Sequence, residues 1–219
     1  MSLLQKGGIL MIPIVICSIV AVAIIIERLV KLARVRRENA RFLDAIRGRI
    51  RAGDLDEAIH VCRENLSSPL SAVFLEALLH IPQGERRTRE AISEAGEREA
   101  ARLERNVGGL ATIVGGAPLL GFLGTVIGMI LAFQRIEALG GNVDASVLAG
   151  GIWQALLTTA AGLTVAVPTF FAHNYIVARV HSEVQIMEDR SRDLMILLTT
   201  GEDRMGFIEE AGADRAGEG

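Results

Sequence analysis

The sequence predicts an all-α integral membrane protein with three transmembrane helices. Half of its 219 residues are hydrophobic, yet 22% are charged, as in an ordinary soluble protein. The charges are unevenly distributed, because Asp, Glu, Lys and Arg are absent from residues 7–26, 107–134 and 145–178. These runs contain 20, 28 and 34 residues, and about 20 helical residues cross a hydrocarbon core of about 30 Å. The pattern excludes an ordinary soluble enzyme and argues against a β-barrel, whose strands would alternate over short segments.

The three runs define the expected spans, at residues 8–27, 107–134 and 145–178. The second and third runs are longer than one crossing requires. We therefore expect spans two and three to extend as long helices into a cytosolic helical domain. A cleaved signal peptide is the alternative for the first run, because Lys6 precedes it. That run is long, lacks an A-x-A cleavage site and is followed by charged residues, which disfavours cleavage.

Basic residues predict the orientation of the spans. Nine of them lie within residues 28–51, whereas only Lys6 precedes the first span and only Arg135 lies between the second and third. The positive-inside rule therefore places residues 28–106 in the cytosol, as a helical domain. The remaining segments follow from this orientation: a short periplasmic N-terminus at 1–7, a short periplasmic loop at 135–144, a cytosolic helical extension at 179–201 and a disordered tail at 202–219.

Turn and capping signals divide the cytosolic part into helices. Asp54 is a plausible N-cap after a basic helix, and Pro69 is suited to the first position of the next helix. The chain is strongly helical beyond Gly84, so we expect one continuous helix over residues 85–136. The charged faces of these helices are compatible with a solvated surface over a small core or with the docking of a partner.

The three charge-free runs contain no Asp, Glu, Lys or Arg, although ionisable groups in membranes commonly mark ion pathways. Only His173, near the cytosolic end of span three, could titrate there, and a lone histidine at such a position more often has an interfacial role than a direct one. If the protein serves proton flow, a partner must therefore supply the carboxylate. Cys17 and Cys62 fall in a span and in the cytosolic part, so we expect neither a disulfide nor a metal site.

Small and hydroxylic residues line one face of span two and one face of span three. They are spaced three or four residues apart, which places them on one side of a helix: Ala117, Gly121, Thr125, Gly128 and Ala132, then Ala155, Thr159, Gly162 and Ala166. Gly124 forms a G-x-x-x-G pattern with Gly128, and Thr158 lies beside the second stripe. These stripes fit a helix-packing seam or, for Thr125 and Thr159, the polar wall of a channel.

Three further residues carry expectations of their own. Pro118 predicts a kink in span two. Pro168 has no N–H to donate to the carbonyl of Thr164, four residues earlier, and nearby hydroxyls can compensate for the missing hydrogen bond. We therefore expect a structural role for Thr164. Gln154 is costly in lipid and should face protein or water.

Two segments resemble a known family. Residues 117–129, APLLGFLGTVIGM, closely resemble the second-span signature of the ExbB/TolQ/MotA proton-channel family. Residues 151–163, GIWQALLTTAAGL, with the later Val167-Pro168 and Asn174-Tyr175, resemble the third-span signature. The specific resemblance covers about residues 108–178, and the topology matches over nearly the whole chain. The short N-terminus is closer to TolQ-like members than to those with long periplasmic extensions, and three spans argue against the flagellar stators, which usually have four.

The resemblance implies a function that is not enzymatic. Such proteins form rings, typically pentamers, in the bacterial inner membrane, around an ExbD/TolR-like single-span partner that is typically a dimer. The partner carries the titrating Asp, protons are the coupling ion and no other cofactor is implied. The motor then energises a TonB-like or TolA-like protein for outer-membrane transport or envelope maintenance. Alternatives are a gliding-type motility motor or a purely structural scaffold.

The resemblance also implies roles for individual residues. Thr125 and Thr159 match pore-facing threonines of the family, and Thr158 and Gln154 are expected beside them on the proton pathway. Gln154 stands where related proteins often have Glu, and it can form hydrogen bonds but cannot titrate. The expected packing residues are Gly121, Gly124, Gly128, Gly162, Pro118 and Pro168.

Overall fold

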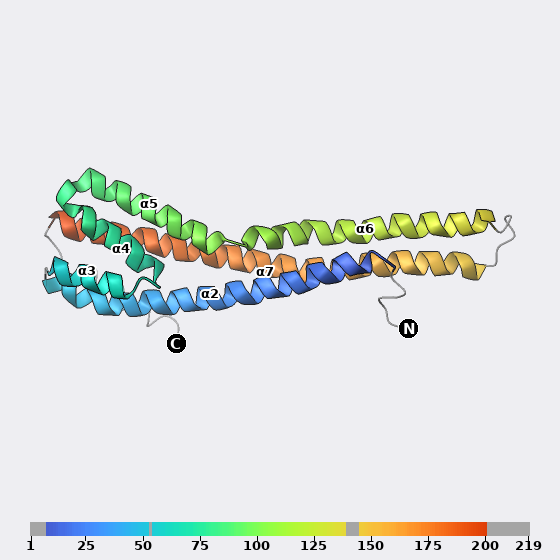
Figure 1. Cartoon of the computed structure of the whole chain (residues 1–219), viewed down its shortest axis with the longest axis horizontal. Helices are drawn as coiled ribbons and strands as arrows, with labels where there is room; N and C mark the ends of the chain where they lie inside the picture. Colours follow the sequence, from blue (N-terminus) through green and yellow to red (C-terminus); the bar gives the residue numbers. More distant parts are fainter. Residues whose placement is uncertain (1–7, 53, 139–144, 201–219) are drawn as a thin grey trace. The chain divides into compact units, whose positions relative to one another are not determined.

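The computed structural model describes residues 8–52, 54–138 and 145–200, and within these ranges no strand occurs. The all-α class is therefore confirmed. The expected N-terminus (1–7), most of the expected loop (139–144) and the tail (202–219) lie outside the described residues. The elements are α2 (Met11–Ala52), α3 (Leu55–Glu64), α4 (Pro69–His80), the 3₁₀ turn η1 (Ile81–Gln83), α5 (Glu85–Glu104), α6 (Val107–Ala138) and α7 (Ala145–Thr200) (Figure 1).

Three stretches are long and apolar enough to cross a membrane: Met11–Ile50, Glu85–Ala138 and Ala149–Ile196. Little of their most apolar windows is buried within the chain, namely 17%, 28% and 28%. An apolar surface this large is stable only against lipid or other protein. The three predicted membrane-spanning helices are thus present, and α7 continues without a break from the third apolar run to Thr200, as expected.

The chain divides into two compact units. The membrane unit comprises the chain up to Leu29 together with Asn106–Val177, and the helical unit comprises Val30–Arg105 together with the chain from Ala178 onward. Cys17 belongs to the membrane unit and Cys62 to the helical unit, and both are free thiols.

The expectation of one continuous helix over 85–136 is wrong at one point. The structure ends α5 at Glu104 and starts α6 at Val107, with Asn106 in the left-handed region at φ 67°. Asparagine tolerates this conformation better than most residues do. The Asn106 side-chain amide donates a hydrogen bond to the Glu27 carboxylate at 3.2 Å, which ties the break to α2.

The capping and turn residues of the helical unit lie at the helix ends that the sequence predicts. Asp54 caps α3 by accepting a hydrogen bond from the backbone N–H of Glu57 at 3.1 Å. Ser68 caps α4, with Pro69 at its first position, and Gly84 precedes α5 at φ 94°. A positive φ of this size strongly favours glycine. The break between α4 and α5 therefore occurs where the sequence predicts it.

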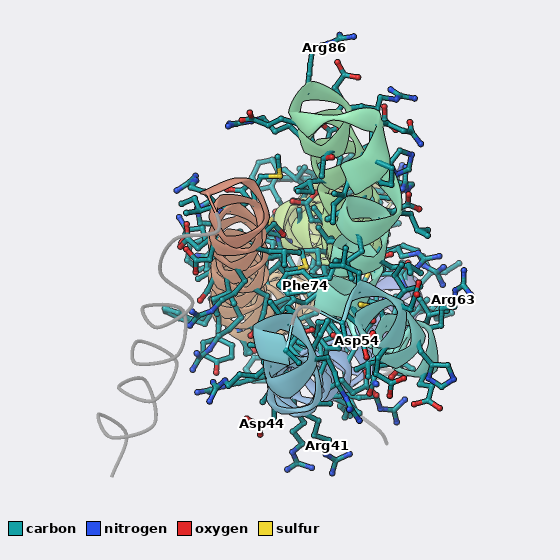
Figure 2. The ribbon with its side chains drawn as sticks, turned by 90° about the vertical axis from the view of Figure 1, so that its left-hand side faces the viewer. Arg41, Asp44, Asp54, Arg63, Phe74 and Arg86 are labelled. Carbon is teal, nitrogen blue, oxygen red and sulfur yellow. The ribbon has the colours of Figure 1, made fainter. Side chains whose placement is uncertain are left out.

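The core of the helical unit is made of large apolar side chains. Phe42 of α2 and Phe74 of α4 are fully buried and meet edge to face, with ring centroids 5.4 Å apart. Figure 2 shows Phe74 among the helices, with Arg41 and Arg86 pointing outward. Met187 and Leu194 of α7 are also buried. Such burial of aromatic and aliphatic area drives folding in water.

A buried polar cluster joins α2, α4 and α7 in the same unit. The side-chain carbonyl of Asn39 accepts a hydrogen bond from the Ser68 hydroxyl at 2.7 Å, and the Asn39 amide donates to the Glu183 carboxylate at 3.4 Å. Burial raises the pKa of Glu183, while the positive charges of Arg36 and Arg179 and the Asn39 hydrogen bond oppose this increase. The cluster satisfies polar groups that burial would otherwise leave without partners.

Candidate functional site

The candidate site is the seam between α6 and α7 in the membrane unit, where the two helices run side by side (Figure 1). The buried residues of each helix lie three or four positions apart and are mostly small: Ala117, Gly121, Gly124, Gly128 and Ala132 in α6, and Gly151, Ala155, Thr158, Gly162 and Ala166 in α7. One stripe on each helix therefore forms the contact. Close approach through small residues is how helices associate in lipid, where apolar side chains gain nothing by leaving their surroundings.

The glycines of the seam have no room for a side chain. A Cβ atom at Gly121 would lie 2.9 Å from the Thr159 Cα atom and 3.0 Å from the Thr158 carbonyl oxygen. A Cβ at Gly128 would lie 2.9 Å from the Ala155 Cβ, and one at Gly162 would lie 2.5 Å from the Ala117 carbonyl oxygen. Several of these neighbours are backbone atoms, which cannot move aside without shifting a helix.

Gly124 and Gly151 complete the same contact. A Cβ at Gly124 would overlap the Thr158 hydroxyl, and one at Gly151 would lie 2.6 Å from the Ala132 Cβ. In the sequence, Gly151 appears only as the first residue of the third-span motif, directly after Gly150. Gly150 has no atom within 4 Å of its Cβ position, so the contact belongs to Gly151.

The three threonines differ in their hydrogen bonds. The Thr159 hydroxyl donates across the seam to the Gly121 carbonyl at 2.9 Å. The Thr125 hydroxyl donates to the Phe122 carbonyl of its own helix at 2.6 Å, and the buried Thr158 hydroxyl donates to the Ala155 carbonyl at 2.8 Å. A hydroxyl that donates one hydrogen bond keeps lone pairs that can accept others. Thr125 and Thr159 are half-buried, so these lone pairs remain within reach of a ligand or water.

The structure brings Thr125 and Thr159 to one flank of the seam and Gln154 to the other. The Gln154 amide lies against Gly8, just before α2, and the Cβ position of Gly109 in α6 lies 3.3 Å from Ile24 of α2. Helical geometry turns Thr159 about 140° away from Gln154 and Thr125 about 160° away from Gly109. Helix α2 therefore covers the flank of Gln154 and Gly109, and the two threonines lie on the flank that α2 leaves uncovered.

Gln154 contacts protein, as its polarity requires, but sequence reasoning could not identify its neighbour. Gly8 has a φ of 74°, and a Cβ there would collide with the Gln154 amide. The positive φ is the constraint that favours glycine there, because the end of the Gln154 side chain is flexible and can move aside.

The two prolines lie inside continuous helices. Pro118 is half-buried in α6, whereas Pro168 is exposed in α7 and so lies outside the seam. The Thr164 hydroxyl donates to the Ala160 carbonyl at 2.8 Å, which suits the structural role expected for it. His173 is half-buried, and its Nδ1 atom lies 3.4 Å from the Asn174 side-chain oxygen.

Sequence reasoning missed a charged cluster at the end of the membrane unit. The Arg28 side chain is almost fully buried and pairs with the neighbouring Glu27, which also accepts the hydrogen bond from Asn106. A buried guanidinium requires such a partner. The adjacency of Glu27, Arg28 and the first apolar run was the available signal. Among the residues that the structure describes, no group of three His, Cys, Asp or Glu side chains could hold a metal ion.

Comparisons with known proteins agree with this architecture. Residues 65–189 match the model of the MotA/TolQ/ExbB proton channel family. The chain is 33% identical over 172 residues to a biopolymer transport protein ExbB-like 3 of Synechocystis, covering 78% of this chain and 81% of that protein. It is 28% identical over 200 residues to the biopolymer transport protein ExbB of Neisseria meningitidis, covering 85% of this chain and 89% of that one.

A third relative is an ExbB homologue of Methanothermobacter thermautotrophicus, 30% identical over 193 residues, which are 86% of this chain but only 66% of that protein. The family is one of proton channels and not a class of enzymes. With three helices suited to crossing a bilayer, the chain is a multi-pass membrane protein. It therefore belongs to the MotA/TolQ/ExbB proton channel family, as a subunit that couples proton flow to energy transduction.

Proposed function

We propose that this chain forms a ring, a pentamer in the simplest case, in the bacterial inner membrane. The ring surrounds the single spans of an ExbD/TolR-like partner, present as a dimer. Protons driven by the proton-motive force pass between ring and partner. The resulting motion energises a TonB-like or TolA-like protein for outer-membrane transport or envelope maintenance. The chain's N-terminus is periplasmic and its C-terminus cytosolic, in accord with the basic residues that follow the first span.

The observation that carries this proposal is a half-buried pair of hydroxyls on an acid-free seam. Thr125 and Thr159 share the flank that α2 leaves uncovered, and residues 107–134 and 145–178 contain no acidic side chain. A proton path along this flank requires a titrating group, and a partner with a membrane Asp supplies it. The threonine hydroxyls then offer hydrogen bonds to water and to that Asp in both of its protonation states.

Gln154 and Thr158 occupy different positions in this proposal. Thr158 is buried in the seam, and Gln154 lies on the flank covered by α2. Neither shares the uncovered flank, so we propose that they support the wall of the path from behind. Gly121, Gly124, Gly128 and Gly162 hold α6 and α7 close enough for the two threonines to act together.

A structural scaffold is the competing function, and the hydrogen bond from Thr159 to the Gly121 carbonyl favours it, because packing alone would explain that contact. A gliding-type motility motor would use the same seam and differs only in what is driven. The scaffold and the motor make opposite predictions for the threonine hydroxyl.

The deciding experiment replaces Thr159 by Val, which removes the hydroxyl at similar volume, with Thr159→Ser as the matched control that retains it. The complex with its partner is purified and its ring order is checked by native mass spectrometry. We expect Thr159→Val to keep the wild-type mass but to reduce proton uptake in energised vesicles at least about tenfold. Thr159→Ser should retain most of it. Full proton uptake by an intact Thr159→Val complex would favour the scaffold.

A further inference from the structure

One face of α2 stays exposed along the helix and changes in character beyond the apolar run. Its residues are spaced three or four apart, which aligns them on one side of the helix. The first part of this face is aliphatic: Ile12, Ile16, Ile19, Ala23, Ile26 and Val30, all exposed. Arg34, Arg37 and Arg41 continue the same series and are exposed too. Figure 2 shows Arg41 pointing away from the helical unit.

Most other exposed arginines of the helical unit form ion pairs. In α5, for example, Arg86 and Arg87 pair with Glu90 at 2.9 and 3.0 Å, and Arg102 pairs with Glu99 at 2.8 Å. In α7, Arg192 pairs with Asp189 at 3.6 Å.

Arg34, Arg37 and Arg41 differ, because none of them forms an ion pair with a residue that the structure describes. Glu38 lies between them in the sequence but is half-buried and pairs with none of the three. The face thus presents three guanidinium groups without a protein anion. We call these three residues the arginine face.

The chain direction of α2 tilts the side chains of the arginine face toward the apolar part of the same helix. Side chains on an α-helix tilt toward the helix N-terminus. The N-terminal part of α2 is the apolar span, so the stems of the three arginines lean back toward the membrane.

The distances along α2 also fit the headgroup layer. At 1.5 Å per residue, Arg34, Arg37 and Arg41 lie about 6, 10 and 16 Å beyond Val30 along the helix axis. The polar layer of a bilayer extends about 5 to 7 Å beyond the hydrocarbon, and charges act over a further Debye length of about 8 Å. Long basic side chains reach toward the interface as well.

We propose that the arginine face of α2 binds the phosphate groups of anionic phospholipids at the membrane surface. A guanidinium group matches the geometry of a phosphate and can bind it with two parallel hydrogen bonds. The same face is aliphatic up to Val30 and so contacts the acyl chains of the lipids whose headgroups lie beside the arginines. This continuity favours a lipid over a protein as the occupant. The proposal requires that α2 is inserted in a bilayer and does not depend on the proton-coupling function.

The test titrates the purified full-length complex with phosphatidylglycerol or with phosphatidylcholine and counts the bound lipids by native mass spectrometry. Each arginine near an anionic surface is worth roughly a fivefold change in binding. We expect the wild type to bind phosphatidylglycerol at least about tenfold more tightly than phosphatidylcholine. The triple variant Arg34→Gln/Arg37→Gln/Arg41→Gln should lose this preference, and the corresponding triple change to Lys should retain most of it. Inorganic phosphate should compete weakly, because it lacks the acyl chains.

The matched control is Arg86→Gln/Arg87→Gln/Arg89→Gln in α5, which removes the same charge from ion-paired positions and should leave the preference intact. Native mass and circular dichroism establish that each variant retains its ring and its helices. The proposal is overturned if both triple glutamine variants bind phosphatidylglycerol equally. It is also overturned if the α2 variant keeps its lipids but loses a co-purifying protein, because the arginine face would then be a protein-binding surface.

Discussion

In the membrane unit, α6 and α7 touch through glycine, alanine and threonine, and the Cβ position of Gly121 lies 2.9 Å from the Thr159 Cα atom. In the helical unit, α2 and α4 touch through Phe42 and Phe74, whose ring centroids are 5.4 Å apart. The difference follows from the solvent. Water drives aromatic area into a core, whereas lipid offers no such gain and leaves close contact as the main attraction.

The two units also differ in where they carry charged side chains. The helical unit carries many ion pairs and a part-buried Asn39–Glu183 hydrogen bond, whereas residues 107–134 of α6 and 145–178 of α7 contain no Asp, Glu, Lys or Arg. A charge-free seam costs little in lipid, but it cannot titrate. A proton-driven member of this family built in this way depends on a carboxylate from elsewhere.

The largest effect is expected from breaking the seam with Gly121→Leu. The new side chain would meet backbone atoms of α7, so the helices must separate and the complex should fail to assemble. The matched control is Gly115→Leu in the same helix, because no atom lies within 4 Å of its Cβ position. Size-exclusion chromatography of the detergent-purified complex measures both. Equal amounts of assembled complex from the two variants would contradict a close-packed seam.

The next largest effect is expected in the other unit, from Phe74→Ala. Removing a fully buried phenylalanine costs about 3–5 kcal/mol, so the urea midpoint of the helical unit should fall markedly when followed by circular dichroism. Phe122→Ala serves as the control, since Phe122 is 64% exposed on α6. A Phe122 variant as destabilised as the Phe74 variant would mean that large side chains hold both units together.

The smallest effect concerns pH. Because the pKa of Glu183 is raised in the folded protein, the folded state binds a proton more readily than the unfolded state does. The resulting stabilisation is present below the ordinary pKa of 4.5 and is lost as pH rises through the raised pKa. Glu183→Gln stays neutral and can keep its contact with Asn39. It should flatten the decline of the melting temperature of the helical unit above pH 4.5 and raise that temperature at neutral pH. If the melting temperature of Glu183→Gln declines above pH 4.5 as steeply as that of the wild type, another group causes the pH dependence.

Much of the fold could be predicted because its signals are local. Charge-free runs indicate the apolar helices, and capping residues such as Asp54 and Ser68 mark helix starts. The break at Asn106 could not be predicted, since it depends on a hydrogen bond to Glu27, far away in the sequence. An asparagine within a helical pattern does not by itself indicate a left-handed residue.

The site was predictable in composition but not in arrangement. The spacing of Gly121, Gly128 and Gly162 indicates a packing face. It does not predict that Thr125 and Thr159 lie on one flank of that face and Gln154 on the opposite flank. That division depends on where α2 packs, and the sequence of α2 does not specify its position against α6 and α7. The contact of Gln154 with Gly8 is of this kind, because it joins residues from distant parts of the chain.

We propose that the flank of Thr125 and Thr159 faces the partner's membrane span. Disulfide cross-linking in intact membranes can test this contact. Thr125→Cys and Ile16→Cys are each introduced into a Cys17→Ala background, and each is paired with a cysteine placed one turn from the partner's membrane Asp. Cys62 does not compete, since burial raises the pKa of its thiol to about 12. We predict that Thr125→Cys cross-links to the partner and that Ile16→Cys, on the aliphatic face of α2, does not. Cross-linking from Ile16→Cys and none from Thr125→Cys would contradict the account.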